Sequence, residues 1–134
     1  MECIFCKIVK NEIPNQRVYE DRQVMAFLDI SPTTKGHVLV VPKLHAANLE
    51  EIDDLSLGYV AAVARKLAMA MKKAFGAKGY NLVVNNGSEA GQLIGHFHFH
   101  IIPRYNKTEL PAWPHAAYKA GEAQSLCRKL KAAL

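Results

Sequence analysis

The 134-residue sequence predicts a single domain that combines short β-strands with one long helix. Residues 96–101 alternate between histidine and apolar side chains, and a period of two residues is that of a β-strand. Residues 37–41 consist of His37 and an apolar run, as expected of a strand that is covered on both faces. From residue 55 to residue 75, apolar side chains recur at steps of three and four, which is the spacing of a helix face.

Several short segments with clear local signals precede the long helix. They are a helical turn over residues 3–10 and strands over residues 17–21, 23–28 and 37–41. Residues 29–36 contain the turn formers Asp, Ser, Pro and Gly, so they are expected to connect the second strand to the third. Pro42 is expected to end that third strand.

The long helix is expected over residues 55–75. Asp53 or Asp54 can cap its start, and Gly76 and Gly79 can stop it. Alanine residues widen its apolar surface, which leaves two alternatives open. Part of this surface packs on a second subunit, or all of it packs on the chain's own sheet.

The second half of the chain adds a strand over residues 80–85, a polar loop over residues 86–92 and the histidine strand over residues 96–102. The two strands are close in sequence, so antiparallel pairing is the simplest topology. Beyond about residue 106 the proline-containing chain is expected to be loosely ordered, with a short helix over residues 121–133. We therefore expect one domain over residues 1–134.

Composition narrows the class of protein. No apolar run approaches the ~18 residues of a membrane span, and the amino-terminal residues lack the basic region of a signal peptide, which favours a cytoplasmic protein without membrane contact. Residues 1–54 hold six Lys and Arg against nine Asp and Glu, whereas residues 55–134 hold eleven against three. A basic half suits an anionic ligand such as a nucleotide, or a nucleic acid, without choosing between them.

The first two cysteines stand in a Cys-x-x-Cys motif at Cys3 and Cys6. This spacing presents two thiolates to one zinc ion, and His45 and His96 are candidates for the other two ligands of a closed, structural site. Redox chemistry and simple burial remain alternatives, although no strand precedes the motif as in thioredoxin-like proteins. Cys127 lies in the predicted terminal helix, and we assign it no function.

The histidine strand carries a candidate nucleophile. With His96 at the metal, His98 and His100 remain on the same strand face, and a neutral imidazole can attack phosphorus. The loop over residues 85–92 offers amides and glycine N–H groups to phosphate oxygens. Read alone, this loop is an ordinary strand connection.

These motifs together resemble the histidine triad (HIT) superfamily, and its zinc-containing Hint-like branch in particular. Residues 96–102 fit the signature of three histidines alternating with apolar residues, residues 27–32 resemble the nucleoside-binding segment, and residues 41–45 resemble the Pro-Lys-x-His element. Residues 85–87 with 91–92 resemble the phosphate loop. The resemblance implies an α+β fold with a five-stranded antiparallel sheet, a long central helix and short terminal helices, the sheet extending across a homodimer.

The resemblance also implies a HIT-family nucleotide hydrolase. It would act at the α-phosphate of a purine nucleotide derivative: a nucleoside phosphoramidate, an aminoacyl adenylate or a dinucleoside polyphosphate. His98 would form a covalent nucleotidyl intermediate that water resolves to a nucleoside monophosphate, and His100 would support the phosphate and ribose side. The other implied site residues are Asp29, Phe27, Ile30, Asn85 and Gln92 for the nucleotide, Val18 or Tyr19 beside the base, and Cys3, Cys6, His45 and His96 for structural Zn²⁺.

Some of these assignments have structural alternatives. Asp29 also reads as the start of a turn, and Phe27 and Ile30 also read as core residues. Leu93 departs from the hydroxyl residue that many Hint-like members place there to assist the leaving group, which disfavours phosphoramidates more than it disfavours nucleotide binding. The alternative functions are a nucleotidyl transferase, a hydrolase of adenylated nucleic acids, and a non-catalytic nucleotide-binding or interaction protein.

Overall fold

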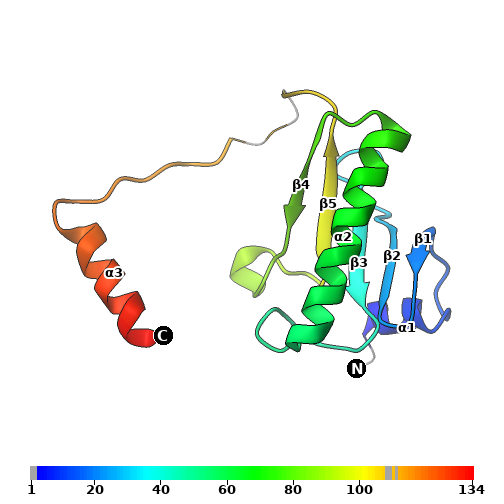
Figure 1. Cartoon of the computed structure of the whole chain (residues 1–134), viewed down its shortest axis with the longest axis horizontal. Coiled ribbons are helices and arrows are strands. Elements are labelled where there is room, and N and C mark those ends of the chain that lie inside the picture. Colours follow the sequence, from blue (N-terminus) through cyan, green and yellow to red (C-terminus); the bar gives the residue numbers. More distant parts are fainter. Residues whose placement is uncertain (1–2, 108–109, 111) are drawn as a thin grey trace.

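The computed structural model describes residues 3–107, 110 and 112–134. Its elements follow the order α1 (Ile4–Val9), β1 (Arg17–Glu20), β2 (Val24–Leu28), β3 (Val38–Pro42), α2 (Asp54–Phe75), β4 (Gly79–Val83), the 3₁₀ turn η1 (Ser88–Ala90), β5 (Phe99–Arg104) and α3 (Glu122–Ala133). The strands form one antiparallel sheet in the order β1-β2-β3-β5-β4 (Figure 1). The predicted α+β fold is confirmed.

The predicted signals at the ends of α2 are present. The Asp53 carboxylate accepts a hydrogen bond of 2.8 Å from the Ser56 N–H, which satisfies one of the free donors at the start of the helix. Gly76 ends the helix in the left-handed region at φ 69°, where glycine has no Cβ to clash. Gly79 belongs instead to β4, so one glycine is sufficient to stop the helix.

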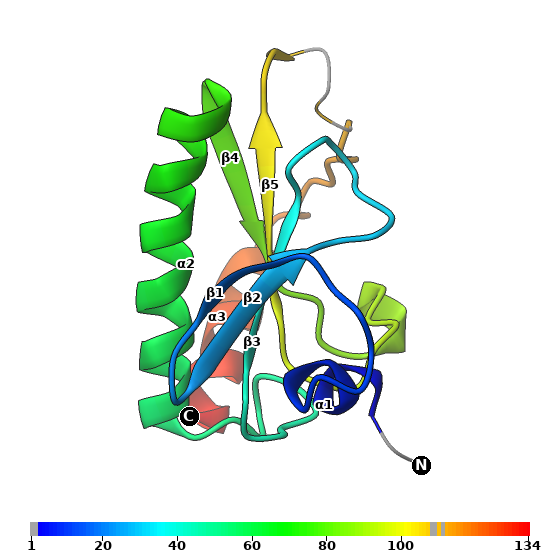
Figure 2. The same ribbon diagram turned by 90° about the vertical axis from the view of Figure 1, so that its right-hand side faces the viewer.

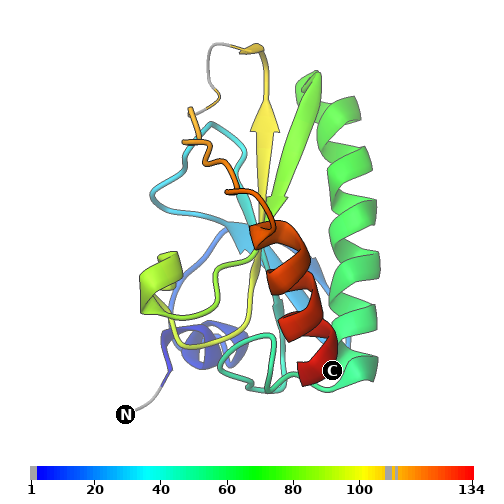
Figure 3. The same ribbon diagram turned by 90° about the vertical axis from the view of Figure 1, so that its left-hand side faces the viewer.

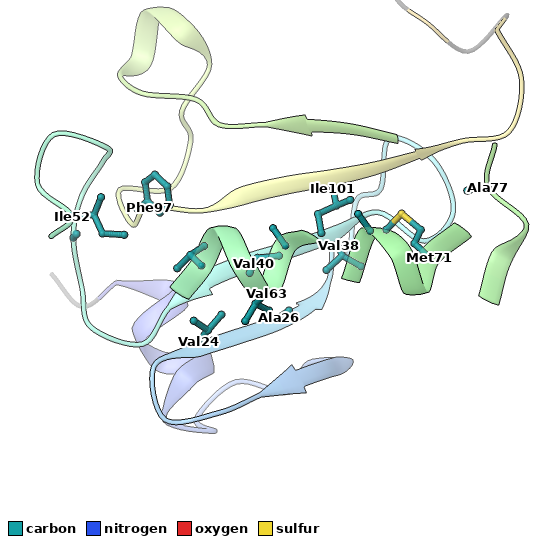
Figure 4. Close-up of a cluster of buried hydrophobic side chains, with 14 residues drawn as sticks. Val24, Ala26, Val38, Val40, Ile52, Val63, Met71, Ala77, Phe97 and Ile101 are labelled. Atoms are coloured by element: carbon teal, nitrogen blue, oxygen red, sulfur yellow. The ribbon is translucent and has the colours of Figure 1, made fainter. Parts of the chain in front are cut away.

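The sheet has a different cover on each face. In Figure 2, α2 runs along one face, while α1 and the loop that contains η1 lie beside the other. The α2 face holds the larger apolar cluster, drawn in Figure 4, which includes Val24, Ala26, Val40, Val60 and Ile101. On the α1 face, a smaller cluster consists of Phe5, Ile8, Met25, Phe27, Leu39 and Val41.

β2 shows how the sequence divides between the two clusters. Val24 and Ala26 belong to the α2 side, and Met25 and Phe27 belong to the α1 side, which is the alternation of a strand. All four residues are almost fully buried. The strand is therefore apolar throughout, because both of its faces are covered.

The histidine strand begins later than predicted. β5 starts at Phe99, so the prediction of a strand over residues 96–102 is wrong for its first three residues. The Phe97 N–H donates to the Ala46 carbonyl at 2.7 Å instead of to a neighbouring strand, and Pro42 at the end of β3 has no N–H to offer a ladder. The side chains nevertheless alternate between the two faces of the sheet, because Phe97 packs in the α2-side cluster, where it is 1% exposed.

The carboxyl-terminal segment stands apart from the sheet. α3, predicted over residues 121–133, is present, and Figure 1 shows it joined by an extended segment and away from the other elements. In Figure 3, which is viewed from the side of α3, the helix lies in front of the sheet. Part of the tail predicted to be loosely ordered, residues 108, 109 and 111, lies outside the described residues. Among the helices that are described, none has the length and apolar character needed to cross a membrane.

Candidate active site and metal centre

A pocket of about 500 Å³ opens on the α1 face of the sheet. Apolar side chains from α1, the following loop, β2, β3 and the loop before the histidines form much of its wall: Ile4, Phe5, Ile8, Ile13, Pro14, Phe27, Leu39 and Ile94. Polar groups gather at Asp29, Asn85, His98 and His100. A largely apolar pocket with a few convergent polar groups is typical of small-molecule sites.

His98 lines this pocket and is 6% exposed. Its Nδ1–H donates to the His96 carbonyl at 2.7 Å, because a carbonyl oxygen can only accept. The neutral ring therefore carries its lone pair on Nε2. The Phe5 and His98 rings are nearly perpendicular, with centroids 5.0 Å apart, and this contact restricts the orientation of the imidazole.

His100 is oriented by a relay that begins in the backbone. The Thr33 N–H donates to Nδ1 of His37 at 3.0 Å, so the proton of neutral His37 lies on Nε2. That Nε2–H faces Nδ1 of His100 at 2.9 Å, which leaves the proton of neutral His100 on its own Nε2. This nitrogen is buried without a partner among the described residues, so it is a donor available to an acceptor in the pocket.

The same relay argues against a second metal ion. Asp29, His37 and His100 offer three ligand atoms within 4.8 Å of one another. A metal at Nε2 of His37 would need the proton on Nδ1, where the Thr33 N–H already donates. This cluster is better suited to hydrogen bonding.

Four donor atoms converge at the other end of the histidine segment. The Nε2–H of His96 donates to the Pro42 carbonyl at 2.8 Å, which turns the Nδ1 lone pair towards Cys3, Cys6 and His45. This carbonyl fixes the tautomer in the way that outer partners fix metal-binding histidines. His96 is 0% exposed, and the cysteines are partly buried.

The donor distances fit one tetrahedral zinc ion. Nδ1 of His96 lies 3.4 Å from the Cys3 sulfur, 3.6 Å from the Cys6 sulfur and 3.1 Å from Nδ1 of His45. The sulfur of Cys6 lies 3.4 Å from Nδ1 of His45. Zinc bonds of about 2.3 Å to sulfur and about 2.0 Å to nitrogen give ligand separations of roughly 3.3–3.8 Å in a tetrahedron. The four predicted metal ligands are therefore together and suitably spaced.

Asn85 and Gln92 have different positions. Asn85 lines the pocket, as expected of a phosphate-binding side chain. The amide of Gln92 is used within the protein: its Nε2 donates to the carbonyls of Ala47 and Ile94 at 2.7 and 3.0 Å, and its oxygen accepts from the Gly87 N–H at 2.9 Å. In this arrangement Gln92 holds the loop together, and it is not among the residues that line this pocket, so its contact with phosphate stays a prediction.

Phe27 and Ile30 both line the pocket but differ in exposure. Phe27 is 3% exposed and packs edge-on against Phe5 at 5.5 Å, so it is a core residue whose surface also forms the pocket wall. Ile30 is 95% exposed at the rim. The alternative that these two side chains belong to the core is therefore wrong for Ile30. Phe27 is both a core residue and part of the pocket wall.

The residues suggested beside the base from β1 do not reach the pocket. Tyr19 packs against the α2-side cluster with the Lys66 ammonium 5.5 Å above its ring, and Val18 is absent from the pocket lining. Leu93, in contrast, lines the rim and is 92% exposed. Its apolar side chain offers the pocket no hydrogen-bond donor.

Burial keeps the histidines neutral. Loss of water lowers the pKa of His98 below 6.5, and the hydrogen bond to the His96 carbonyl opposes this only in part. Burial, followed by the neighbouring imidazoles of His98 and His37, lowers the pKa of His100 to about 4. Near neutral pH, the pocket therefore presents a lone pair from His98 and an N–H from His100.

Sequence reasoning missed His37 and the wall formed by α1. His37 is 3% exposed and belongs to the same sheet face as Leu39, which pairs with His100 across β3 and β5. The alternation of the predicted strand could have placed His37 on the histidine face. No local signal shows that α1 would lie across that face.

Comparisons with known proteins show the family of this chain. A family model described as the HIT domain matches residues 10–107. Protein hit of Bacillus subtilis is 53% identical over 106 residues, which cover 78% of this chain and 72% of the relative. Adenosine 5'-monophosphoramidase hnt1 of Schizosaccharomyces pombe is 48% identical over 107 residues, covering 80% and 77%.

Solved structures show the same architecture. A crystal structure of a HIT family member from Bacillus subtilis matches with a TM-score of 0.91 at 41% identity, over 100% of this chain and 98% of that chain. A Zn-bound histidine triad family protein from Mycobacterium smegmatis matches with a TM-score of 0.79 at 33% identity, over 100% and 99%. From its sequence, its sheet and its histidine cluster, this chain belongs to the HIT family.

Proposed function

We propose that this chain hydrolyses a purine nucleotide derivative at its α-phosphate through a covalent nucleotidyl-His98 intermediate and releases a nucleoside monophosphate. The observation that carries the proposal is the hydrogen bond from Nδ1–H of His98 to the His96 carbonyl. It leaves the nucleophilic lone pair on Nε2 of a ring that lines the pocket. A lowered pKa supports the neutral, nucleophilic form.

The proposed reaction has two balanced steps. Nε2 of His98 bonds to phosphorus, and the bond from phosphorus to the leaving group breaks with its electron pair on that group. Water then attacks phosphorus, its proton passes to solvent, and the bond from phosphorus to Nε2 breaks to restore the neutral imidazole. One water molecule is consumed, and phosphorus is neither oxidised nor reduced.

The surrounding groups suit the parts of a nucleotide. Nε2–H of His100 would donate to a phosphate oxygen, which gives its unpartnered donor an acceptor, and Asn85 would add an amide contact. Asp29 would accept from the ribose hydroxyls, although one of its oxygens also accepts from the Ser31 N–H at 2.8 Å. The apolar wall from α1 and β2 would hold the base.

Leu93 favours particular leaving groups. An amine must gain a proton as it departs from a phosphoramidate, and an apolar side chain at the rim cannot supply one. A phosphate anion departing from a dinucleoside polyphosphate needs less help. We therefore propose that phosphoric anhydrides react faster than phosphoramidates.

Zinc would be held by Cys3, Cys6, His45 and His96, whose separations fit it. Four protein ligands close the coordination shell, so the metal would stabilise the fold and would not activate water. Through His96 it would fix the backbone carbonyl that orients His98.

The experiment compares diadenosine polyphosphate with adenosine 5'-phosphoramidate in the wild-type protein, measuring AMP release and the mass of the quenched protein. A transient gain of one AMP on the peptide that contains His98 supports hydrolysis. A stable adduct that turns over only with an added acceptor indicates a transferase, and binding without adduct or turnover indicates a non-catalytic protein. Either result overturns the proposed hydrolase.

Leu93→Ser tests the choice of leaving group. The added hydroxyl should raise the phosphoramidate rate by about tenfold, a modest share of the effect of a general acid, and should leave the anhydride rate nearly unchanged. Leu93→Ala is the matched control, because it removes the same side chain without adding a donor. Equal effects of the two variants would remove Leu93 as the reason for any preference.

A further inference from the structure

The tautomer of His100 depends on the loop between β2 and β3, residues 29–37. In this loop the Thr33 N–H donates to Nδ1 of His37 at 3.0 Å, and Nε2 of His37 faces Nδ1 of His100 at 2.9 Å. His37 is 3% exposed, so water hardly competes for its nitrogens. The position of one backbone N–H therefore decides which nitrogen of His100 carries the proton.

The opposite pair of tautomers uses the same two rings. If the Thr33 N–H moved away, the proton of His37 could lie on Nδ1, and its Nε2 would accept from Nδ1–H of His100. The lone pair of His100 would then lie on Nε2, the nitrogen that has no partner among the described residues. A lone pair repels a phosphate oxygen to which an N–H would donate. The loop thus selects whether His100 is a donor or an acceptor.

Two hydroxyl groups hold the loop on the end of β5. Pro103 has no N–H with which to extend the backbone ladder towards the loop. The Thr34 hydroxyl instead donates to the Pro103 carbonyl at 2.6 Å, and the Tyr105 hydroxyl donates to the Lys35 carbonyl at 2.6 Å. We call these two hydrogen bonds the latch. Together they fix the two residues that directly follow Thr33.

The end of α2 also supports the loop. Gly36 has φ 96°, which favours glycine, and a Cβ there would lie 2.6 Å from the Phe75 ring. The loop therefore passes close to the last residue of α2. The His37 N–H donates to the Thr34 carbonyl at 3.1 Å, which closes the turn beside the latch. These contacts leave the loop little freedom as long as the latch is formed.

We propose that Thr34 and Tyr105 are positioning residues whose hydroxyls keep the Thr33 N–H on His37 and so keep His100 a hydrogen-bond donor. The proton positions need no nucleotide, so they can be tested in the free protein. Their effect on phosphate binding and turnover rests on the proposed function. Because both hydroxyls hold one loop, the loss of both should exceed the sum of the single losses.

The first experiment reads the proton positions by ¹⁵N NMR of the histidine rings at neutral pH, since protonated and lone-pair nitrogens have separate shifts. The test pair is Thr34→Val with Tyr105→Phe. The control pair is Thr34→Ser with Tyr105→Phe, which keeps a hydroxyl at position 34. If the test pair does not fold, Thr34→Val against Thr34→Ser in the otherwise wild-type chain gives the same comparison.

The wild-type protein and the control pair should carry the His100 proton on Nε2. In the test pair, a measurable fraction of His100 should carry it on Nδ1, with the matching change at His37. Identical proton positions in the test and control pairs overturn the proposal, and so does a wild-type His100 with its proton on Nδ1.

The second experiment compares the binding of AMP and adenosine by calorimetry. Only the phosphate of AMP would contact Nε2 of His100, so the test pair should bind AMP about tenfold more weakly than the control pair does. The affinity for adenosine should change much less. Equal losses for the two ligands would indicate a general distortion of the pocket and would overturn the role of the latch.

Turnover separates this proposal from the proposed function. The kcat for AMP release should be about tenfold lower in the test pair than in the control pair, a part of the roughly 10²–10³-fold cost of removing a donor to a developing charge. Equal kcat values would contradict the positioning role. Absence of turnover in the wild-type protein would contradict the hydrolase, and the NMR and binding comparisons would still decide the role of the latch.

Discussion

The two faces of the sheet are built by the same strands but are used differently. On the α2 face, Phe97 and Ile101 pack into the larger core with Val60 and Val63 from the helix. On the α1 face, the intervening His96, His98 and His100 contact thiols, a carbonyl and another imidazole. A short alternating segment therefore places stabilising side chains on one side and reactive ones on the other.

The difference lies in how each face satisfies its side chains. The α2 face needs only apolar contact, so many apolar sequences could fill it. On the α1 face, each histidine has one nitrogen committed to a protein partner, which determines what the other nitrogen can do. The α2 face should accordingly respond to substitution in stability, and the α1 face in activity or metal content.

The largest expected effect is on turnover. His98→Ala should lower the rate of AMP release by on the order of 10³-fold or more, because no other imidazole presents a free lone pair at its position. Urea unfolding should show a much smaller change, since the ring lines a pocket. Turnover at the wild-type rate would show that His98 is not the nucleophile.

On the α2 face, Phe97→Ala should reduce the free energy of unfolding by about 3–5 kcal/mol, because removal of a ring that is 1% exposed leaves a cavity. Leu93→Ala, at a side chain that is 92% exposed, serves as the control and should change it by less than about 0.5 kcal/mol. Urea titrations of both variants check this. Similar values for the two would mean that Phe97 is not part of a tightly packed core.

Cys3→Ser should remove a metal ligand without touching the α2 face. We expect elemental analysis to find less zinc in the variant. The free energy of unfolding should also fall, but by less than the roughly 10 kcal/mol that zinc contributes to folds that depend wholly on it, because the apolar core remains. Cys127→Ser, at an exposed cysteine, is the control and should keep its metal. Wild-type protein that contains no zinc when purified without chelator would rule out the site.

The smallest expected effect concerns pH. The pKa of His100 in the folded protein is about 4, below its ordinary 6.5, so the neutral ring stabilises the fold above about pH 6.5, and this contribution is lost as pH falls towards 4. His100→Asn should therefore flatten the decline of stability across this interval. The test is to measure the urea midpoints of the wild-type protein and the variant at pH 7 and pH 5, in the presence of chelator. Equal falls of the two midpoints between these pH values would contradict the prediction.

Local patterns were sufficient for most elements, and the structure brings the four predicted metal ligands together. The helix spacing predicted α2, Asp53 was one of two predicted caps, and the alternation placed His98 and Phe97 on opposite faces. Boundaries were less accurate at β5, because the Phe97 N–H bonds to Ala46, a residue remote in sequence. The hydrogen bonds from the Gln92 amide to the carbonyls of Ala47 and Ile94 could not be predicted for a similar reason.

By itself, the sequence determined which chemical groups are present and which face of each strand or helix they occupy, since these follow from side-chain identity and a fixed backbone period. Only the tertiary structure decided which groups meet. Cys3 reaches His96 across 93 positions, and His37 reaches His100 across 63. Such meetings depend on strand register and on the packing of α1 over the sheet, and long-range packing of this kind leaves no periodic trace in the residues that it joins.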